Sequence, residues 1–361
     1  MRIVVAMSGG VDSSVAAALL AQQGHEVIGL SMQLYDQSEG RATFGSCCTL
    51  DDLHDARRVA ARLGIPHYIV NFEEKFNETV VSDFVREYAA GRTPIPCVHC
   101  NGDLKFATLV DRAAGFGADM VATGHYARVI HDEASNRFRL LRGRDAGKDQ
   151  SYFLFTLSQT QLAHAIFPLG DLDKPAVREH ARALDLAVAD KPDSHEICFV
   201  ASGDHAAFLE DHGVLKTEGV IRNVEGERVG RHGGVHRFTV GQRKGLGLSS
   251  PIPLYVVGID AASAAVTVGP REALERLELT ASGVNWIAGI PPTGGTRVTA
   301  QIRHRHKEAA ATIEPMEADR VCLAFDEPQS AIAPGQALVM YQGDEVVGGG
   351  WIDNKRGAAR C

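Results

Sequence analysis

Features that would indicate a membrane or secreted protein are missing from this 361-residue sequence. No run of about 18 apolar residues is present, so we expect no segment that spans a membrane. The apolar run at the N-terminus is short and ends in glycines, so we do not expect a signal peptide. We therefore expect a cytoplasmic protein whose seven cysteines are reduced, because an odd number does not suit a disulfide framework.

An excess of basic residues is also missing. The chain has 37 Lys and Arg against 45 Asp and Glu, a formal net charge of -8. This balance argues against a general nucleic-acid coating protein but is compatible with a local basic patch. The chain is too long for one ordinary core, so we expect two or three domains.

The first third of the chain has the pattern of a parallel sheet. Apolar strand-like runs alternate with helical patterns through residue 124, which predicts a doubly wound α/β arrangement. We expect strands at 2–7, 26–32, 67–71 and 119–123, and helices at 13–23, 49–63, 72–90 and 103–114.

The pattern then changes to antiparallel β structure. Residues 128–142 are typical of a hairpin, and two helices are expected at 159–166 and 175–184. From about residue 213, short β-rich runs such as VHRFTVG and LYVVGID alternate with Gly and Pro, which predicts one or two small barrels.

These patterns predict a fold class and a division of the chain. The fold class is α/β: a doubly wound parallel-sheet domain followed by small, mostly antiparallel β-barrel-like domains. We expect the boundaries 1–202 for the first domain with its appended helices, 203–275 for a central β-rich domain and 276–361 for a C-terminal barrel.

The strongest chemical signal is AMSGGVDSS, between the first strand and the first helix. Gly9 and Gly10 let the backbone approach a ligand, and the helix N-terminus directs N–H groups and positive charge toward it. Such a place binds phosphate, although neither the G-x-x-x-x-G-K-[ST] nor the G-x-G-x-x-G motif is present. Asp12 is a candidate for holding Mg²⁺ on a pyrophosphate. The alternative is a plain strand–turn–helix with an N-cap.

The segment GRTPIPCVHCNGDLKF, residues 91–106, holds two cysteines and a histidine. Cys97, His99 and Cys100 offer only three zinc ligands, too closely spaced, with no second C-x-x-C nearby. A dithiol redox pair would begin a helix directly after a strand, whereas this pair follows a helix and a Pro-x-Pro loop. We expect Cys100 to precede a helix that begins near Gly102, whose N-terminus would favour the thiolate.

Motifs along nearly the whole chain carry a family resemblance. SGGVDS resembles the PP-loop of ATP pyrophosphatases, which cleave ATP between the α and β phosphates. With it come GRTPxPxxxCNxxxKF, GKDQSYFL (147–154), DSxxICF around Cys198, FTVGQRKGLG (238–247) and APGQ (333–336). In this order the motifs resemble the tRNA-specific 2-thiouridylase family.

The resemblance implies an enzyme, an ATP-dependent tRNA-uridine 2-sulfurtransferase. ATP with Mg²⁺ would adenylate the C2 oxygen of the wobble uridine, and sulfur would come from a persulfide on Cys198, with Cys100 as partner thiol. A transient Cys100–Cys198 disulfide is implied, as are products 2-thiouridine, AMP and pyrophosphate. The partners would be the tRNA anticodon stem-loop and a persulfide donor protein, with no membrane partner, permanent cofactor or fixed metal site.

The resemblance also assigns contact residues. The nucleotide would contact Ala6, Met7, Ser8, Gly9, Gly10, Val11, Asp12, Ser13, Met32 and Gly124. The tRNA and its target base would contact Ile95, Pro96, Cys97, His125, Lys148, Asp149, Gln150, Arg303, His304 and Gln336. Cys97 stands where many members have Asp, and we expect it to fill space rather than react. His125 also replaces an Asp of some members.

Local charge supports an RNA partner. Residues 216–249 contain seven Lys or Arg against three Glu, and residues 297–307 contain four with no acid. In a strand, Arg303, Arg305 and Lys307 would share one face. Two alternatives remain: another PP-loop enzyme, such as an amidating or ligating synthetase, and a non-catalytic, nucleotide-dependent tRNA-binding protein.

Overall fold

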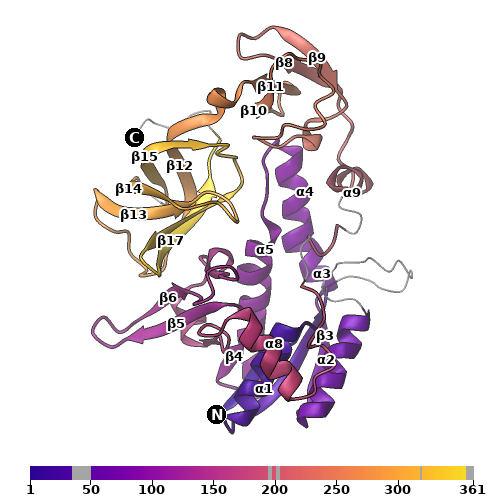
Figure 1. Cartoon of the computed structure of the whole chain (residues 1–361), viewed down its shortest axis with the longest axis vertical. Coiled ribbons are helices and arrows are strands. Elements are labelled where there is room, and N and C mark those ends of the chain that lie inside the picture. The colour runs from indigo at the N-terminus through magenta and orange to yellow at the C-terminus, as the bar shows by residue number, and fades with distance from the viewer. Residues whose placement is uncertain (35–49, 194–196, 201–203, 318, 355–361) are drawn as a thin grey trace.

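The computed structural model describes residues 1–34, 50–193, 197–200, 204–317 and 319–354. Its strands form three sheets, and Figure 1 shows them as three bodies around the long helical segment that contains α4. Within the described residues, no helix has both the length and the apolar character that crossing a membrane requires.

The first body is the predicted doubly wound domain. Its five-stranded parallel sheet has the order β3-β2-β1-β4-β7. The strands are β1 (Arg2–Ala6), β2 (Glu26–Gln33), β3 (His67–Asn71), β4 (Met120–Ala122) and β7 (Ala165–Ile166). The order reverses at β1, so β1 and β4 border the position where such sheets bind ligands, beyond their carboxyl ends.

Eight α-helices belong to the described part of this domain, and several of them pack against the sheet. They are α1 (Val11–Gln22), α2 (Leu50–Leu63), α3 (Glu73–Phe76), α4 (Ser82–Ala89), α5 (Pro96–His99), α6 (Ala107–Gly115), α7 (Gln159–Ala163) and α8 (Lys174–Ala183). Helix α1 is rich in alanine, and Val15, Ala16, Ala17 and Ala18 are fully buried. Such small side chains allow α1 to pack closely in one core cluster with α8.

Two of the predicted helices contain π-helical turns. Residues 73–89 form α3, a π-helical segment η1 (Asn77–Val81) and α4 without interruption. The next helix begins at Pro96 and runs through α5, η2 (Cys100–Phe106) and α6. The prediction that it begins near Gly102 was wrong: proline favours the first helical position, so Cys100 lies in the second turn rather than ahead of the helix.

The predicted helix at 159–166 also ends early. Helix α7 stops at Ala163, and the next residues form β7, because the Val121 amide donates to the His164 carbonyl and the Thr123 amide to that of Ile166. The edge strand is too short to show a period of its own, so the sequence pattern merged it with the helix.

The central body is a four-stranded sheet of order β10-β11-β8-β9. Its elements are α9 (His205–Asp211), β8 (Gly219–Arg222), β9 (Arg228–His232), β10 (Tyr255–Asp260) and β11 (Ala265–Gly269). The run VHRFTVG, expected to be β-rich, instead forms the 3₁₀ turn η4 (Val235–Arg237) and a loop. Phe238 still packs in the core of this body, with Val256 and Val266.

The third body is a closed six-stranded antiparallel barrel, because β12 pairs with both β15 and β17. After η5 (Arg271–Leu274), its strands are β12 (Glu275–Trp286), β13 (Thr296–Gln301), β14 (Ala309–Pro315), β15 (Val321–Ser330), β16 (Ala337–Gln342) and β17 (Glu345–Ile352). The predicted strand face of Arg303, Arg305 and Lys307 was wrong: β13 ends at Gln301, and Arg305 has φ +63°, which belongs to a turn.

The predicted hairpin joins the first body to this barrel. Strands β5 (Ala127–Asp132) and β6 (Arg137–Arg142) turn at 133–136, as expected, and β6 pairs with β17 through Leu141 and Glu345. The hairpin therefore extends the barrel sheet toward the first body (Figure 1).

Candidate functional site

The glycine loop has a shape that only glycine permits. Gly9 has φ +75°, and a Cβ there would lie 2.1 Å from the carbonyl oxygen of Asp52. A Cβ at Gly124 would lie 2.6 Å from the Ser13 amide nitrogen, so the end of β4 touches the start of α1. The loop is thus fixed between α2 and β4.

Hydroxyl groups complete the loop. The Ser8 amide donates to Oγ of Ser13 at 3.1 Å, and Oγ of Ser14 donates to the Gly10 carbonyl at 2.8 Å. Gly10 caps α1, whose first turn contains Asp12. Ala6 ends β1, Val11 begins α1 and Met32 lies near the end of β2, so these predicted nucleotide contacts gather at one edge of the sheet.

A buried lysine lies beside this loop. Nζ of Lys174 is 2.8 Å from both carboxylate oxygens of Asp12 and 2.8 Å from Oδ1 of Asp193. The Tyr126 hydroxyl donates to Oδ1 of Asp12 at 2.8 Å. Burial and the neighbouring Asp12 charge raise the pKa of Tyr126 far above its usual range, so this hydroxyl keeps its proton and remains a donor.

Asp193 gathers cations near the loop. Nζ of Lys148 lies 2.6 Å from its Oδ2, and Arg178 lies 3.4 Å from its Oδ1. Burial alone would raise the pKa of Asp193, but hydrogen bonds from Lys148 and Lys174 outweigh it and lower the pKa to about 2. One carboxylate thus holds three cations close to a loop of phosphate-binding shape.

Lys191 ties the loop to α2. Its Nζ donates to the Gly9 carbonyl at 3.0 Å and contacts Asp52 and Asp55, each at 2.6 Å. Burial lowers the pKa of Lys191, but these two carboxylates more than compensate and raise it. The segment that leads to Cys198 is therefore anchored at its start to the glycine loop.

Sequence motifs did not identify Lys174, Tyr126 or Arg178 as part of this site. Lys174 is 162 residues from Asp12, and its local signal is that of a helix start, with Asp173 as N-cap and a proline in the first turn. Only the folded sheet brings the two together. The sequence offered one weak signal for Lys174 as a site residue: a lysine in the first turn of a helix that follows an edge strand.

The structure brings the two predicted reactive cysteines to one apolar cluster. Cys100 is 8% exposed and packs in a cluster with Met32 and Leu104, and Cys198 packs against the same cluster. Cys97 is exposed, one turn earlier in the helix. Ile95 and Pro96 lie at the start of that helix.

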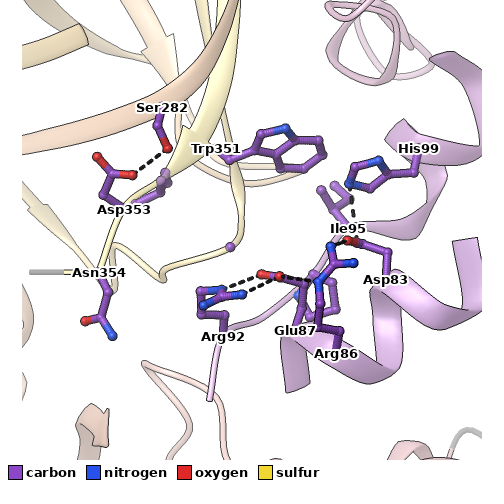
Figure 2. Close-up of a pocket in the computed structure, with 13 residues that line it drawn as sticks. Asp83, Arg86, Glu87, Arg92, Ile95, His99, Ser282, Trp351, Asp353 and Asn354 are labelled. Atoms are coloured by element: carbon purple, nitrogen blue, oxygen red, sulfur yellow. Dashed lines mark hydrogen bonds and ion pairs between the residues drawn. The ribbon is translucent and has the colours of Figure 1, made fainter. Parts of the chain in front are cut away.

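His99 points away from a shared site with the two neighbouring cysteines. Its ring stacks on Trp351 with centroids 4.5 Å apart, and Nε2 lies 3.4 Å from Asp83 (Figure 2). Nδ1 lies 2.7 Å from Asp103. Burial lowers the pKa of His99, but the Asp103 hydrogen bond and both carboxylate charges outweigh it and raise the pKa. The zinc alternative therefore loses its imidazole ligand.

His99, Asp83 and Trp351 line a cleft of about 370 Å³ between α4 and the barrel (Figure 2). Its charges are largely paired: Arg92 binds Glu87 through two nitrogens, and Arg86 contacts Asp83. The cleft is a junction between the first body and the barrel.

His125 lies between the cysteine helix and the glycine loop. Its Nδ1 is 2.8 Å from the Thr123 hydroxyl, and its ring lies near Phe106 and Phe167. Burial, with a smaller contribution from the charge of Lys105, lowers the pKa of His125 to about 3. The imidazole is therefore neutral at physiological pH.

Residues 148–150, predicted to contact tRNA, have internal partners. Besides the Lys148–Asp193 pair, Asp149 accepts from the Gly143 and Ser151 amides at 3.0 and 3.1 Å. Oε1 of Gln150 accepts from the Tyr126 amide at 3.0 Å. These contacts connect the segment to the Asp12 network, and a role in tRNA binding stays a prediction.

Two of the predicted contacts in the barrel, His304 and Gln336, contact the first body, whereas Arg303 bonds to a barrel strand. The His304 ring is 4.6 Å from that of Phe153, and Arg303 donates to the Ser330 carbonyl at 3.1 Å. Nε2 of Gln336 donates to the carbonyls of Thr93 and Pro94, at 3.0 and 3.3 Å. The APGQ and GRTP motifs therefore meet, directly before Ile95.

The fold and this loop define a nucleotide-binding protein of the HUP class with β-barrel domains. A model described as the tRNA methyl transferase HUP domain matches residues 1–202. Models described as a tRNA methyl transferase PRC-barrel domain and an aminomethyltransferase β-barrel domain match residues 206–270 and 276–352.

Curated relatives give the particular family. The tRNA-specific 2-thiouridylase MnmA of Solibacter usitatus is 54% identical over 97% of this chain and 99% of its own. The protein of the same name from Geotalea uraniireducens is 53% identical over 98% and 95%. The chain belongs to the tRNA-specific 2-thiouridylase family.

Solved structures are more distant. One described as a 4-thiouridine synthetase–RNA complex with bound ATP is 16% identical, with a TM-score of 0.35 over 58% of this chain and 50% of that one.

Proposed function

We propose that this protein catalyses the ATP-dependent 2-thiolation of the wobble uridine of tRNA, in the cytoplasm. The observation that carries the proposal is the position of its two cysteines. Cys100 and Cys198 are 98 residues apart (198 minus 100), yet both pack against the cluster that contains Met32, beside the glycine loop. A thiol pair next to a phosphate-binding loop suits sulfur transfer to an adenylated substrate.

ATP would bind with its phosphates at the glycine loop. Backbone N–H groups at the start of α1 and the ammonium of Lys174 supply positive charge there. Asp12 orients Lys174, and a carboxylate oxygen can accept a further partner, so Asp12 also suits Mg²⁺ that arrives with ATP. Lys148 and Arg178, held on Asp193, are within the same cationic cluster.

Adenylation makes the C2 oxygen a good leaving group. The uridine oxygen attacks the α-phosphate and pyrophosphate leaves; sulfur then replaces the adenylated oxygen at C2 and AMP leaves. The neutral imidazole of His125 adds no charge between the two sites, and the apolar cluster around the thiols limits access of water to the intermediate.

The sulfur would be carried by Cys198 as a persulfide, delivered by a persulfide donor protein. In one route, the Cys100 thiolate attacks Sγ of Cys198, and the outer sulfur leaves as hydrosulfide, which attacks C2. In the other, the outer sulfur attacks C2 first, and Cys100 then attacks Sγ of Cys198 to release the thiolated base. Both routes form a Cys100–Cys198 disulfide, which a thiol reductant must reopen.

The anticodon stem-loop would approach from the side of the barrels. Gln336 and His304 connect the barrel to the start of the cysteine helix and to η3 (Ser151–Phe153). Exposed Arg222, Arg228 and Arg231 on β8 and β9 extend a basic surface over the central body, which suits phosphate contacts. Loop bases are readily splayed out for such chemistry.

Variants of the three cysteines test the proposal in a strain that lacks the chromosomal gene. Cys198→Ser should lose both the radiolabelled persulfide on the protein and 2-thiouridine in tRNA, measured by mass spectrometry. Cys100→Ser should keep the label but lose 2-thiouridine. Cys97→Ser is the matched control and should retain most activity, because Cys97 is exposed and lies outside the apolar cluster.

Other results would favour the alternatives. Normal 2-thiouridine in the Cys100→Ser and Cys198→Ser strains would leave the thiols without a role, as in an amidating synthetase. Binding of ATP and tRNA without pyrophosphate release would indicate a non-catalytic binding protein. A dead Cys97→Ser beside an active Cys100→Ser would make Cys97 the partner thiol.

A further inference from the structure

A lysine lies one helical turn beyond Cys100. In the π-helical segment η2, hydrogen bonds join residues five apart, so Lys105 follows Cys100 and Asn101 by one turn. Nζ of Lys105 donates to Oδ1 of Asn101 at 3.1 Å. The ammonium therefore folds back along the helix toward the turn that carries Cys100.

Asn101 is itself held in place. It is 4% exposed, and its amide nitrogen donates to the Phe153 carbonyl at 3.5 Å. A buried amide with a fixed partner is a rigid support, so the Lys105 ammonium has a defined position rather than the freedom of a surface lysine.

The ammonium is close enough to His125 for its charge to act on that imidazole. The charge of Lys105 contributes to the lowered pKa of His125, and His125 follows Gly124, which touches Ser13. His125 therefore connects the surroundings of Lys105 to the proposed nucleotide site.

Two other charged groups near this part of the helix have partners of their own. Asp103 pairs with His99 at the junction with the barrel. Lys75 of α3 donates to the Thr108 hydroxyl at 2.8 Å, about one turn further along the helix. His125 is neutral, and Cys198 packs against the same apolar cluster as Cys100.

We propose that Lys105 is a positioning residue for sulfur transfer, whose ammonium, held by Asn101, stabilises the thiolate of Cys100. The inference rests on the proposed function. Lys105, rather than the helix N-terminus, would be the source of positive charge near Cys100, because the helix begins at Pro96, four residues before Cys100. A nearby cation favours thiolate over thiol, and the thiolate is the nucleophile.

The Cys100 thiolate takes part in the same step, the attack on Sγ of Cys198, in both sulfur routes. Cys100 gives its proton to solvent, a bond forms between its Sγ and Sγ of Cys198, and the bond from Cys198 to the outer sulfur breaks. The outer sulfur keeps that electron pair and leaves as hydrosulfide or with the thiolated base.

The first test measures the pH at which Cys100 becomes reactive, from the rate of alkylation by iodoacetamide resolved by peptide mass spectrometry on the full chain. In Lys105→Met the midpoint should rise by about one pH unit, whereas Lys105→Arg should stay near wild type. Lys75→Met is the matched control, since it removes a lysine charge from the same helix surroundings and should leave the midpoint unchanged. Should Lys105→Met not fold, Lys105→Gln gives the same comparison.

The second test follows single-turnover thiolation of tRNA by persulfide-loaded protein. Lys105→Met should be about tenfold slower at pH 7 and recover near pH 9, with pyrophosphate release unchanged. A wild-type alkylation profile in Lys105→Met, or a rate deficit that high pH does not relieve, overturns the role of Lys105. Thiolation by Cys100→Ser would instead overturn the proposed function itself.

Discussion

The glycine loop and the cysteine helix lie at the same edge of one sheet, but they balance their polar groups differently. At the loop, Asp12, Lys174, Asp193 and Lys191 already form ion pairs with one another or with α2. At the helix, Cys100 is buried in an apolar cluster. At a site for a polyanion, a phosphate can replace a carboxylate as the partner of the same cations. The ionisation of a thiol in an apolar site depends instead on the few charged or polar groups near it.

The largest effect is expected from breaking the ion pairs at the loop. Asp12→Ala and Lys174→Met should each slow pyrophosphate release on the order of 100-fold. Lys174→Met removes positive charge that we propose for the phosphates, and Asp12→Ala removes the carboxylate that orients Lys174 and suits Mg²⁺. A pyrophosphate-coupled assay with saturating tRNA measures it.

Arg144→Met is the matched control, because its pair with Asp171 is exposed on both sides and it should release pyrophosphate at the wild-type rate. A near-wild-type rate in Asp12→Ala would remove the loop from the nucleotide site.

A smaller effect is expected at Arg303, which lies outside both regions. Arg303→Ala should weaken tRNA binding about tenfold and reduce the slope of log K against log salt by about one, as expected for a lost phosphate contact. Filter binding at several salt concentrations measures both quantities. Arg297→Ala is the control, since Arg297 is already paired with Asp326; equal slopes in all three proteins would exclude Arg303 from the interface.

The smallest effect is expected at His99, which anchors the cysteine helix to the barrel. The pKa of His99 is raised in the folded protein, so its ionic contribution is complete below the unfolded value, about 6.5, and is lost as pH rises through the folded value. His99→Gln should therefore reduce stability most at low pH. Loss of the Trp351 stack should cost about 1 kcal/mol at every pH.

Thermal melts between pH 5.5 and 8.5 measure this difference. His131→Gln is the control, because His131 also packs on an aromatic ring, that of Phe138, but on the hairpin. A constant gap between His99→Gln and wild type across this range would contradict an ionic contribution.

The sequence predicted those parts of the fold that depend on local pattern. The alternation through residue 124 predicted the parallel sheet, and SGGVDS predicted a glycine loop of phosphate-binding shape, because both signals are contiguous. The start of the cysteine helix was missed, since Pro96 was interpreted as loop although proline also begins helices. Lys174 was missed because its partner, Asp12, is 162 residues away.

Contacts between distant parts of the chain were likewise not predicted from local sequence patterns. The hairpin β5–β6 was predicted from its alternation and its turn, but no local pattern indicated that β6 would pair with β17. The residues predicted for the tRNA contact also have partners that only the fold reveals, such as Gln336 with Thr93. Their role in tRNA binding remains a prediction.

The pairing of β6 with β17 has a consequence for synthesis on the ribosome. Arg139 and its partner Glu345 are 206 residues apart, so the hairpin emerges long before the strand that completes its sheet. Until the end of the chain appears, β6 has an open edge, which invites association with other nascent chains. Positive charge lies at this edge, since the strand contains Arg137, Arg139 and Arg142. This charge discourages such association until the barrel strands have been synthesised.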